Sequence, residues 1–183
     1  MPIRASRQDA LAAVRRVVAA AAGRTIFLGV DGPGGAGKTA LAAALDADVP
    51  ELVVVHTDDF AAEPEWDWPR LRTQVLEPLA AGRPGRYQRH PWQDEVAGDW
   101  REVPIGRPVL IEGVSATRRE LGVEWALQIW VDAPRDVRLR RAIERDGRAM
   151  LAQWTDVWLP SEEAYLAREH PQQRVDLIID GTA

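Results

Sequence analysis

A glycine-rich octapeptide near the start of the chain has the composition of a phosphate-binding loop. It spans residues 32–39 and fits the pattern G-x-x-x-x-G-K-[ST]. The glycines let the backbone turn tightly and point its N–H groups at phosphate oxygens. A lysine ammonium in this place reaches the β- and γ-phosphates, and the hydroxyl that follows it binds Mg²⁺. The pattern therefore predicts a site for ATP and Mg²⁺, formed by Gly32, Gly34, Gly35, Ala36, Gly37, Lys38 and Thr39.

Carboxylates follow two apolar runs, at the points where strands would end. Asp58 and Asp59 come after residues 52–56, and Glu112 comes after residues 108–111. In phosphoryl transfer, a carboxylate can take the proton of the acceptor hydroxyl or support a metal ion. The sequence thus predicts catalysis or metal support by Glu112 and by at least one of the two aspartates. Helix caps and solvated charges are the alternative interpretation.

Arginines recur every three or four residues in a charged segment that begins at residue 135. Most of them would share one face of a helix, and a basic face can neutralise the charge that develops on a phosphate during transfer. A solvated surface helix with internal ion pairs is the alternative. The arginines at this spacing are Arg135, Arg138, Arg141, Arg145 and Arg148.

Aromatic and cationic residues gather between the second and third apolar runs. Such rings could stack on a base or enclose a sugar. The alternative is that the tryptophans of this segment, Trp92 among them, pack it onto the body of the protein, since most aromatic side chains lie in cores. We predict that residues 57–104 form an acceptor-binding insertion. Its predicted contacts are Phe60, Trp66, Tyr87, Arg89 and His90.

Short apolar runs alternate with helical patterns along the whole chain, which predicts how these residues are positioned. The runs are residues 25–30, 52–56, 108–111, 126–131 and 175–179. Strands separated by helices are typical of an α/β domain, in which helices cover both faces of a parallel sheet. We therefore expect three α/β/α layers with a five-stranded parallel sheet. Right-handed crossovers bring the carboxyl ends of the strands to one edge, where such sheets bind ligands.

Length and charge restrict the class of protein further. The 183 residues suit a single domain over 1–183, and 23 basic against 28 acidic residues give a formal net charge of −5. A mildly acidic chain argues against non-specific binding of nucleic acid, which depends on neutralising phosphates. The chain has no cysteine, and it has no apolar stretch of membrane-spanning length. We expect a cytoplasmic protein with a small-molecule partner and neither nucleic acid nor membrane as a partner, and a homo-oligomer is left open.

Taken in order, these blocks resemble the uridine kinase branch of the P-loop nucleoside kinases, over residues 26–181. The octapeptide matches the phosphate loop of that family, and residues 58–60 resemble its Asp-Ser-Phe-Tyr block. Residues 111–113 resemble the apolar-Glu-Gly block whose glutamate supports Mg²⁺. Residues 138–146 resemble its helix and lid segment, and residues 176–179 resemble its last strand. The resemblance implies a P-loop NTPase domain with a small lid at residues 138–160.

The resemblance also implies roles for single residues. In this interpretation the chain transfers the γ-phosphate of ATP to a hydroxyl of a small molecule, with a nucleoside as the first candidate. The implied catalytic residues are Lys38, Asp58, Arg141 and Arg145, and the implied metal-binding residues are Thr39, Asp58 and Glu112.

Departures from the family pattern bear on the acceptor. The family's tyrosine after the phenylalanine is replaced by Ala61, and its Tyr-Asp pair in the pyrimidine site appears as Tyr87-Gln88. Arg89 and His90 follow, so a carboxylate is lost where cations are added. This suits an anionic acceptor, such as a nucleoside monophosphate or a sugar acid, as the second hypothesis. A non-catalytic nucleotide-binding switch is the third.

Overall fold

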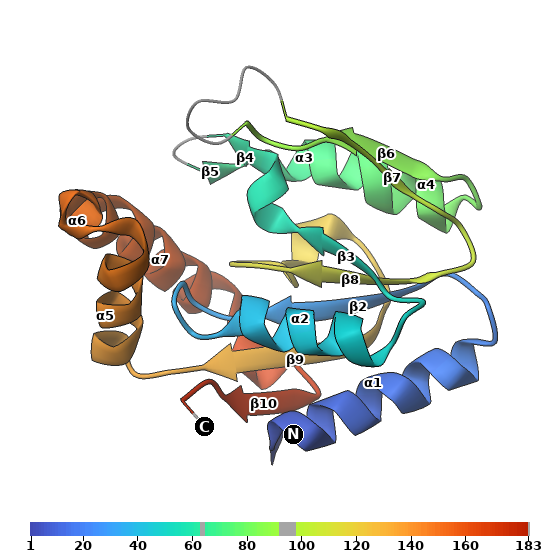
Figure 1. Cartoon of the computed structure of the whole chain (residues 1–183), viewed down its shortest axis with the longest axis horizontal. Helices are drawn as coiled ribbons and strands as arrows, with labels where there is room; N and C mark the ends of the chain where they lie inside the picture. Colours follow the sequence, from blue (N-terminus) through green and yellow to red (C-terminus); the bar gives the residue numbers. More distant parts are fainter. Residues whose placement is uncertain (63–64, 92–97, 183) are drawn as a thin grey trace.

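The computed structural model describes residues 1–62, 65–91 and 98–182, and its centre is a parallel β-sheet (Figure 1). All five pairings between neighbouring strands are parallel. The strands lie in the order β1, β10, β9, β2, β8 and β3. Their bounds are Ile3–Ala5, Leu177–Asp180, Trp125–Asp132, Ile26–Asp31, Pro108–Glu112 and Val53–His56.

The sheet has six strands, so the prediction of five was wrong. The five apolar runs are confirmed as β2, β3, β8, β9 and β10. The additional strand, β1, has only three residues, and one of them is arginine. It pairs with β10 alone, at the edge of the sheet, where Ile3 N–H donates to the Asp176 carbonyl at 2.9 Å. An edge strand held by main-chain bonds needs no run of apolar residues, and so the apolar pattern contained no signal for it.

Two hydrophobic clusters, one on each face of the sheet, make the three layers. Helices α1 (Arg7–Ala21) and α2 (Lys38–Asp48) cover one face, where Val14 and Leu45 pack against strand residues such as Leu28. The start of α1 carries a capping box between Ser6 and Asp9. The other face is covered by residues 68–80 and by helix α7 (Leu159–Glu169). The predicted three-layer α/β/α arrangement is therefore confirmed.

The segment between β3 and β8 folds into short elements at the upper side of Figure 1. A 3₁₀ turn, Thr57–Phe60, follows β3, and the strands β4 (Ala61–Ala62) and β5 (Glu65–Trp66) pair with each other. A continuous helical stretch then comprises α3 (Trp68–Leu71), a π-helical turn (Arg72–Leu76) and α4 (Glu77–Ala80). An antiparallel pair, β6 (Gly85–Gln88) and β7 (Trp100–Val103), completes the segment.

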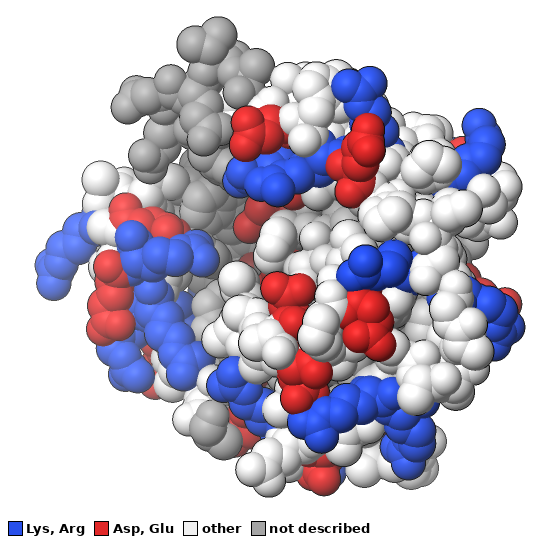
Figure 2. All heavy atoms as spheres, turned by 45° about the vertical axis from the view of Figure 1, so that its right-hand side comes forward, with Lys and Arg blue, Asp and Glu red and all other residues white. Residues whose placement is uncertain are grey.

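The arginine-rich segment forms α5 (Arg135–Asp146), as its spacing predicts. A 3₁₀ turn (Arg148–Met150), the short α6 (Leu151–Gln153) and a π-helical turn (Trp154–Trp158) connect it to α7. Figure 1 shows α5 and α6 beyond the carboxyl ends of the sheet strands. Figure 2 shows positive and negative side chains side by side over the face in view, with basic ones prominent at its left, where α5 lies. Among the described helices, none has the length and apolar character to cross a bilayer.

Candidate active site

The glycine-rich octapeptide is the turn from β2 into α2, at the carboxyl edge of the sheet. Helix α2 begins at Lys38, and its N-cap, Gly37, has a φ of 105°, which favours glycine. No side chain caps this helix end, so the N–H groups of its first turn and its positive dipole end can face an anion. The Lys38 ammonium donates to the Pro33 carbonyl at 2.9 Å, which holds the lysine along the loop.

Thr39 and Glu112 lie next to each other, although they come from α2 and from the end of β8. The Thr39 hydroxyl donates to Glu112 Oε1 at 3.2 Å, and the glutamate side chain is buried. The second oxygen, Oε2, lies 2.6 Å from His56 Nδ1. Mg²⁺ prefers oxygen ligands, and it usually binds through a few protein oxygens together with phosphate oxygens and water. The Thr39 hydroxyl and the Glu112 carboxylate therefore fit such an ion.

His56 orients that glutamate. It ends β3, in register with Glu112 on the neighbouring strand. The hydrogen bond to Glu112 is the main cause that raises the pKa of His56, against the opposing effect of burial. Sequence reasoning alone indicates no more than a structural role for His56.

The two neighbouring aspartates have different environments. Asp59 is buried and accepts hydrogen bonds from the Tyr87 hydroxyl at 2.9 Å and from Arg89 Nε at 3.0 Å. Burial, and then the charge of Asp59, raise the pKa of Tyr87. Asp58 is exposed, and its carboxylate accepts one long bond, at 3.4 Å, from Trp66 Nε1. Asp59 thus ties β6 and the residues after it to the end of β3, and Asp58 is the carboxylate open to a ligand.

The predicted acceptor contacts divide in the same way. Phe60 has no exposed surface and Tyr87 almost none, and their ring centroids are 4.7 Å apart. Both rings pack in the core, so in this structure they support the segment from within. Trp66, Arg89 and His90 are partly exposed beside the aspartates. Trp92 lies outside the described residues.

The two arginines expected at phosphate take different positions. Arg141 donates to the carbonyls of Gly35, at 3.3 Å, and Gly181, at 3.0 Å, so it touches the glycine-rich loop itself. Arg145 is mostly exposed and pairs with Asp146, and its guanidinium lies 5.9 Å from the Trp154 ring centroid. The predicted contact of these arginines with phosphate stays a prediction.

A buried aspartate that sequence reasoning missed anchors the start of the loop. Asp31, the last residue of β2, has no exposed surface and accepts four hydrogen bonds. The donors are Gly32 N–H, Thr117 N–H, the Thr117 hydroxyl and the Tyr165 hydroxyl, at 2.7, 3.0, 2.7 and 2.7 Å. The only signal in the sequence was an acidic residue at the end of an apolar strand.

We expect the change Asp31→Asn to destabilise the fold by about 1–3 kcal/mol, because its amide group would face donors that then lack an acceptor. Urea unfolding followed by circular dichroism measures the loss. The matched control is Asp46→Asn on the exposed side of α2, where we expect a change within about 0.5 kcal/mol. Equal midpoints for both variants would show that the four bonds do not stabilise the loop.

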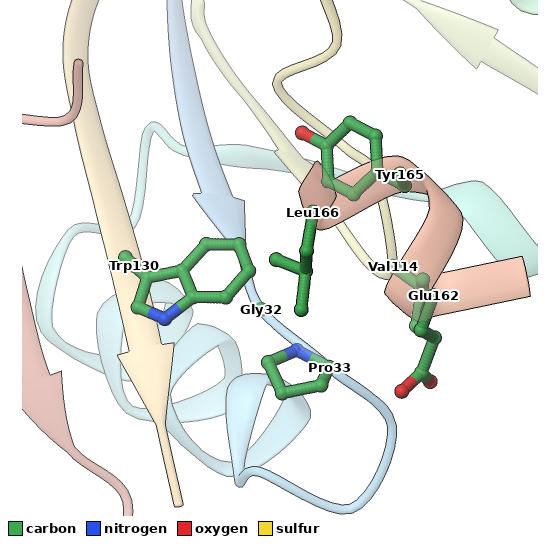
Figure 3. Close-up of a pocket in the computed structure, with 7 residues that line it drawn as sticks. All are labelled: Gly32, Pro33, Val114, Trp130, Glu162, Tyr165 and Leu166. Atoms are coloured by element: carbon green, nitrogen blue, oxygen red, sulfur yellow. The ribbon is translucent and has the colours of Figure 1, made fainter. Parts of the chain in front are cut away.

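Behind the loop the protein is closed. Figure 3 shows Pro33, Trp130 and Leu166 around a small space next to the loop backbone, with Glu162 and Tyr165 at its margin. This space is too small for a water molecule. A ligand of the loop therefore has no room on this side.

Comparisons with solved structures identify the same fold elsewhere. A possible uridine kinase from Bacillus stearothermophilus superposes with a TM-score of 0.67 at 23% sequence identity, over 94% of this chain and 98% of that one. A candidate fructose transport system kinase from Silicibacter sp. TM1040 gives a TM-score of 0.70 at 18% identity, with the same coverage. No protein-family description matches the chain, and no curated protein matches it by sequence. The chain thus has the same three-layer α/β/α fold as these two structures.

Proposed function

We propose that the chain is an ATP-dependent kinase that transfers the γ-phosphate to a hydroxyl of a small molecule, with a nucleoside as the first candidate. The observation that carries the proposal is the meeting of three groups at one edge of the sheet. These groups are the glycine-rich loop with Lys38, the Thr39–Glu112 pair and the exposed carboxylate of Asp58. A loop that only bound nucleotide would need no open carboxylate at the same edge of the sheet, which ranks the non-catalytic switch last.

In this proposal each residue acts through its position. The loop amides and Lys38 bind the triphosphate and stabilise its charge. Thr39 and Glu112 would hold Mg²⁺, which neutralises charge on the phosphates when it is bound. Asp58 orients the acceptor hydroxyl and accepts its proton. Arg141 supports the loop, and Arg145 joins the site as the segment 138–160 closes and excludes water.

Arginines near Asp59 favour the second candidate, an anionic acceptor such as a nucleoside monophosphate or a sugar acid. Arg89 pairs with Asp59, and Arg70 donates to the carbonyls of Asp59 and Gln88 at 2.7 and 2.8 Å. These guanidinium groups lie at Asp59, the chain neighbour of Asp58, and an acidic group on an acceptor bound nearby would find positive charge there.

The test is the production of ADP from ATP and Mg²⁺ with a panel of acceptors. We expect ADP formation to depend on one class of hydroxyl compound, and removal of Mg²⁺ with EDTA to abolish it. The panel pairs each nucleoside with its monophosphate and each sugar with its acid, so that the neutral and anionic candidates separate. Tight ATP binding without transfer to any member would overturn the kinase proposal and favour the switch.

A further inference from the structure

An ion pair between Glu162 and Arg138 contacts the first half of the glycine-rich loop. Glu162 of α7 accepts a hydrogen bond from Gly34 N–H at 2.7 Å through Oε1. Its other oxygen, Oε2, pairs with Arg138 Nη1 of α5 at 3.1 Å. The two side chains are only 6% and 12% exposed, so this ion pair is almost removed from water. The proposed transfer reaction does not use it.

The glycine-rich loop is also closely packed against its neighbours. A Cβ atom added to Gly34 would lie 2.6 Å from the Trp154 ring and 2.7 Å from Glu162 Oε1. A Cβ atom on Gly35 would lie 2.6 Å from the Arg138 carbonyl oxygen. The loop therefore lies directly against α5, α7 and the turn between them, and it cannot shift without moving these elements.

The buried carboxylate of Glu162 needs a positively charged partner beside the loop. Burial raises its pKa, whereas the Gly34 N–H, Lys38 and Arg138 favour its ionised form. Lys38 donates to the carbonyl of Pro33, the residue before Gly34, so the carboxylate lies near the cation that would bind the terminal phosphates. An uncompensated carboxylate would attract Lys38 and repel a triphosphate, and the low dielectric of a buried site strengthens both effects.

We propose that Glu162 is a positioning residue that, by accepting the Gly34 N–H, holds the first half of the glycine-rich loop and Lys38 in place for the terminal phosphate of ATP, with Arg138 as its counter-charge. The proposal rests on the proposed function for the identity of the ligand. In it, Arg138 is no phosphate ligand, although it shares a helix with Arg141 and Arg145. The contacts of Trp154 and Arg138 with the loop also make the position of α5 and of the turn before α7 sensitive to what the loop binds.

The experiment measures dissociation constants of MgATP and MgADP by calorimetry, with no acceptor present. We expect Glu162→Ala to weaken MgATP binding about tenfold or more, and MgADP binding less, because the loosened half of the loop holds Lys38 through the Pro33 carbonyl, and this lysine is expected at the terminal phosphate. Glu162→Gln keeps an acceptor for Gly34 N–H, so we expect it to remain within about threefold of the unmodified protein. The matched control is the exposed neighbour Glu163→Gln, for which we expect no change.

A double-mutant comparison tests the role of Arg138. We expect Arg138→Met to weaken MgATP binding about tenfold or more, since it leaves the carboxylate uncompensated. Adding Glu162→Gln to that variant should restore affinity to about that of Glu162→Gln alone. A rescue of this kind is not expected if Arg138 binds phosphate directly or if the variants merely unfold, and melting temperatures without nucleotide are recorded for each protein.

Three results would overturn the inference. They are equal loss of MgATP and MgADP affinity in Glu162→Ala, no loss at all, and an Arg138→Met defect that Glu162→Gln leaves unchanged. If Glu162→Ala does not fold, the comparison of Arg138→Met with the double variant decides. An unmodified protein that binds neither nucleotide would overturn the proposed function as well. An unmodified protein that binds both, with variants that behave like Glu163→Gln, would overturn only the role of Glu162.

Discussion

Replacing Lys38 with alanine is expected to lower kcat/KM for ATP-dependent transfer by about 100-fold or more, because it removes a preorganised cation from the developing charge. The ammonium is buried at the loop and donates to the Pro33 carbonyl, so its position is fixed by the fold. Coupled-enzyme detection of ADP measures the effect, with the acceptor that the panel identifies.

A control variant separates the effect of losing Lys38 at the loop from the effect of losing one positive charge anywhere in the protein. Lys38 is the only lysine of the sequence, so the control removes an arginine instead. Arg16 stands on the exposed side of α1, and Arg16→Ala should leave kcat/KM within about twofold, as surface substitutions usually do little. Turnover of Lys38→Ala at the rate of Arg16→Ala would remove the lysine from the proposed mechanism.

The change Asp58→Asn is expected to lower kcat by about 100- to 10,000-fold, because it removes the base that accepts the hydroxyl proton. The side chain is exposed, with one long bond from Trp66. We therefore expect the free energy of unfolding to change by less than about 0.5 kcal/mol. Turnover kinetics and urea unfolding on the same preparation measure both quantities.

Asp59→Asn is the contrasting variant, at the adjacent position and with the same chemistry. Asp59 is buried between the Tyr87 hydroxyl and Arg89. We expect this variant to lose about 1–3 kcal/mol of stability, since partners in the core lose a charged acceptor. A large loss of kcat in Asp59→Asn with intact stability, together with a normal kcat in Asp58→Asn, would exchange the roles of the two residues.

The layers and five of the strands could be predicted because buried parallel strands leave a continuous apolar run in the sequence. The glycine-rich octapeptide could be singled out because its chemistry is concentrated in eight consecutive residues, and its role in binding phosphate stays a prediction. β1 could not, since three residues at an edge, one of them charged, carry no such run.

The residues that support the site could not be predicted from the sequence, for another reason. Glu162 meets Gly34 across 128 positions of chain, and Asp31 meets Tyr165 across 134. Such pairs are created by the fold, and neither partner has a local pattern that marks it. The same holds for the two aspartates, whose different burial depends on Tyr87 and Arg89 from a later segment.

β1 and β10 pair with each other, although they are the first and the last strand along the chain. The order of synthesis therefore affects when the sheet can form. The last strand lies between β1 and β9, so β1 has no partner on the ribosome until β10 has been made. During translation the β9 edge stays open, and an unpaired edge can join a strand of another chain. The β9 edge is covered only once β10 has left the ribosome, and fusions that restrain either strand would delay that pairing.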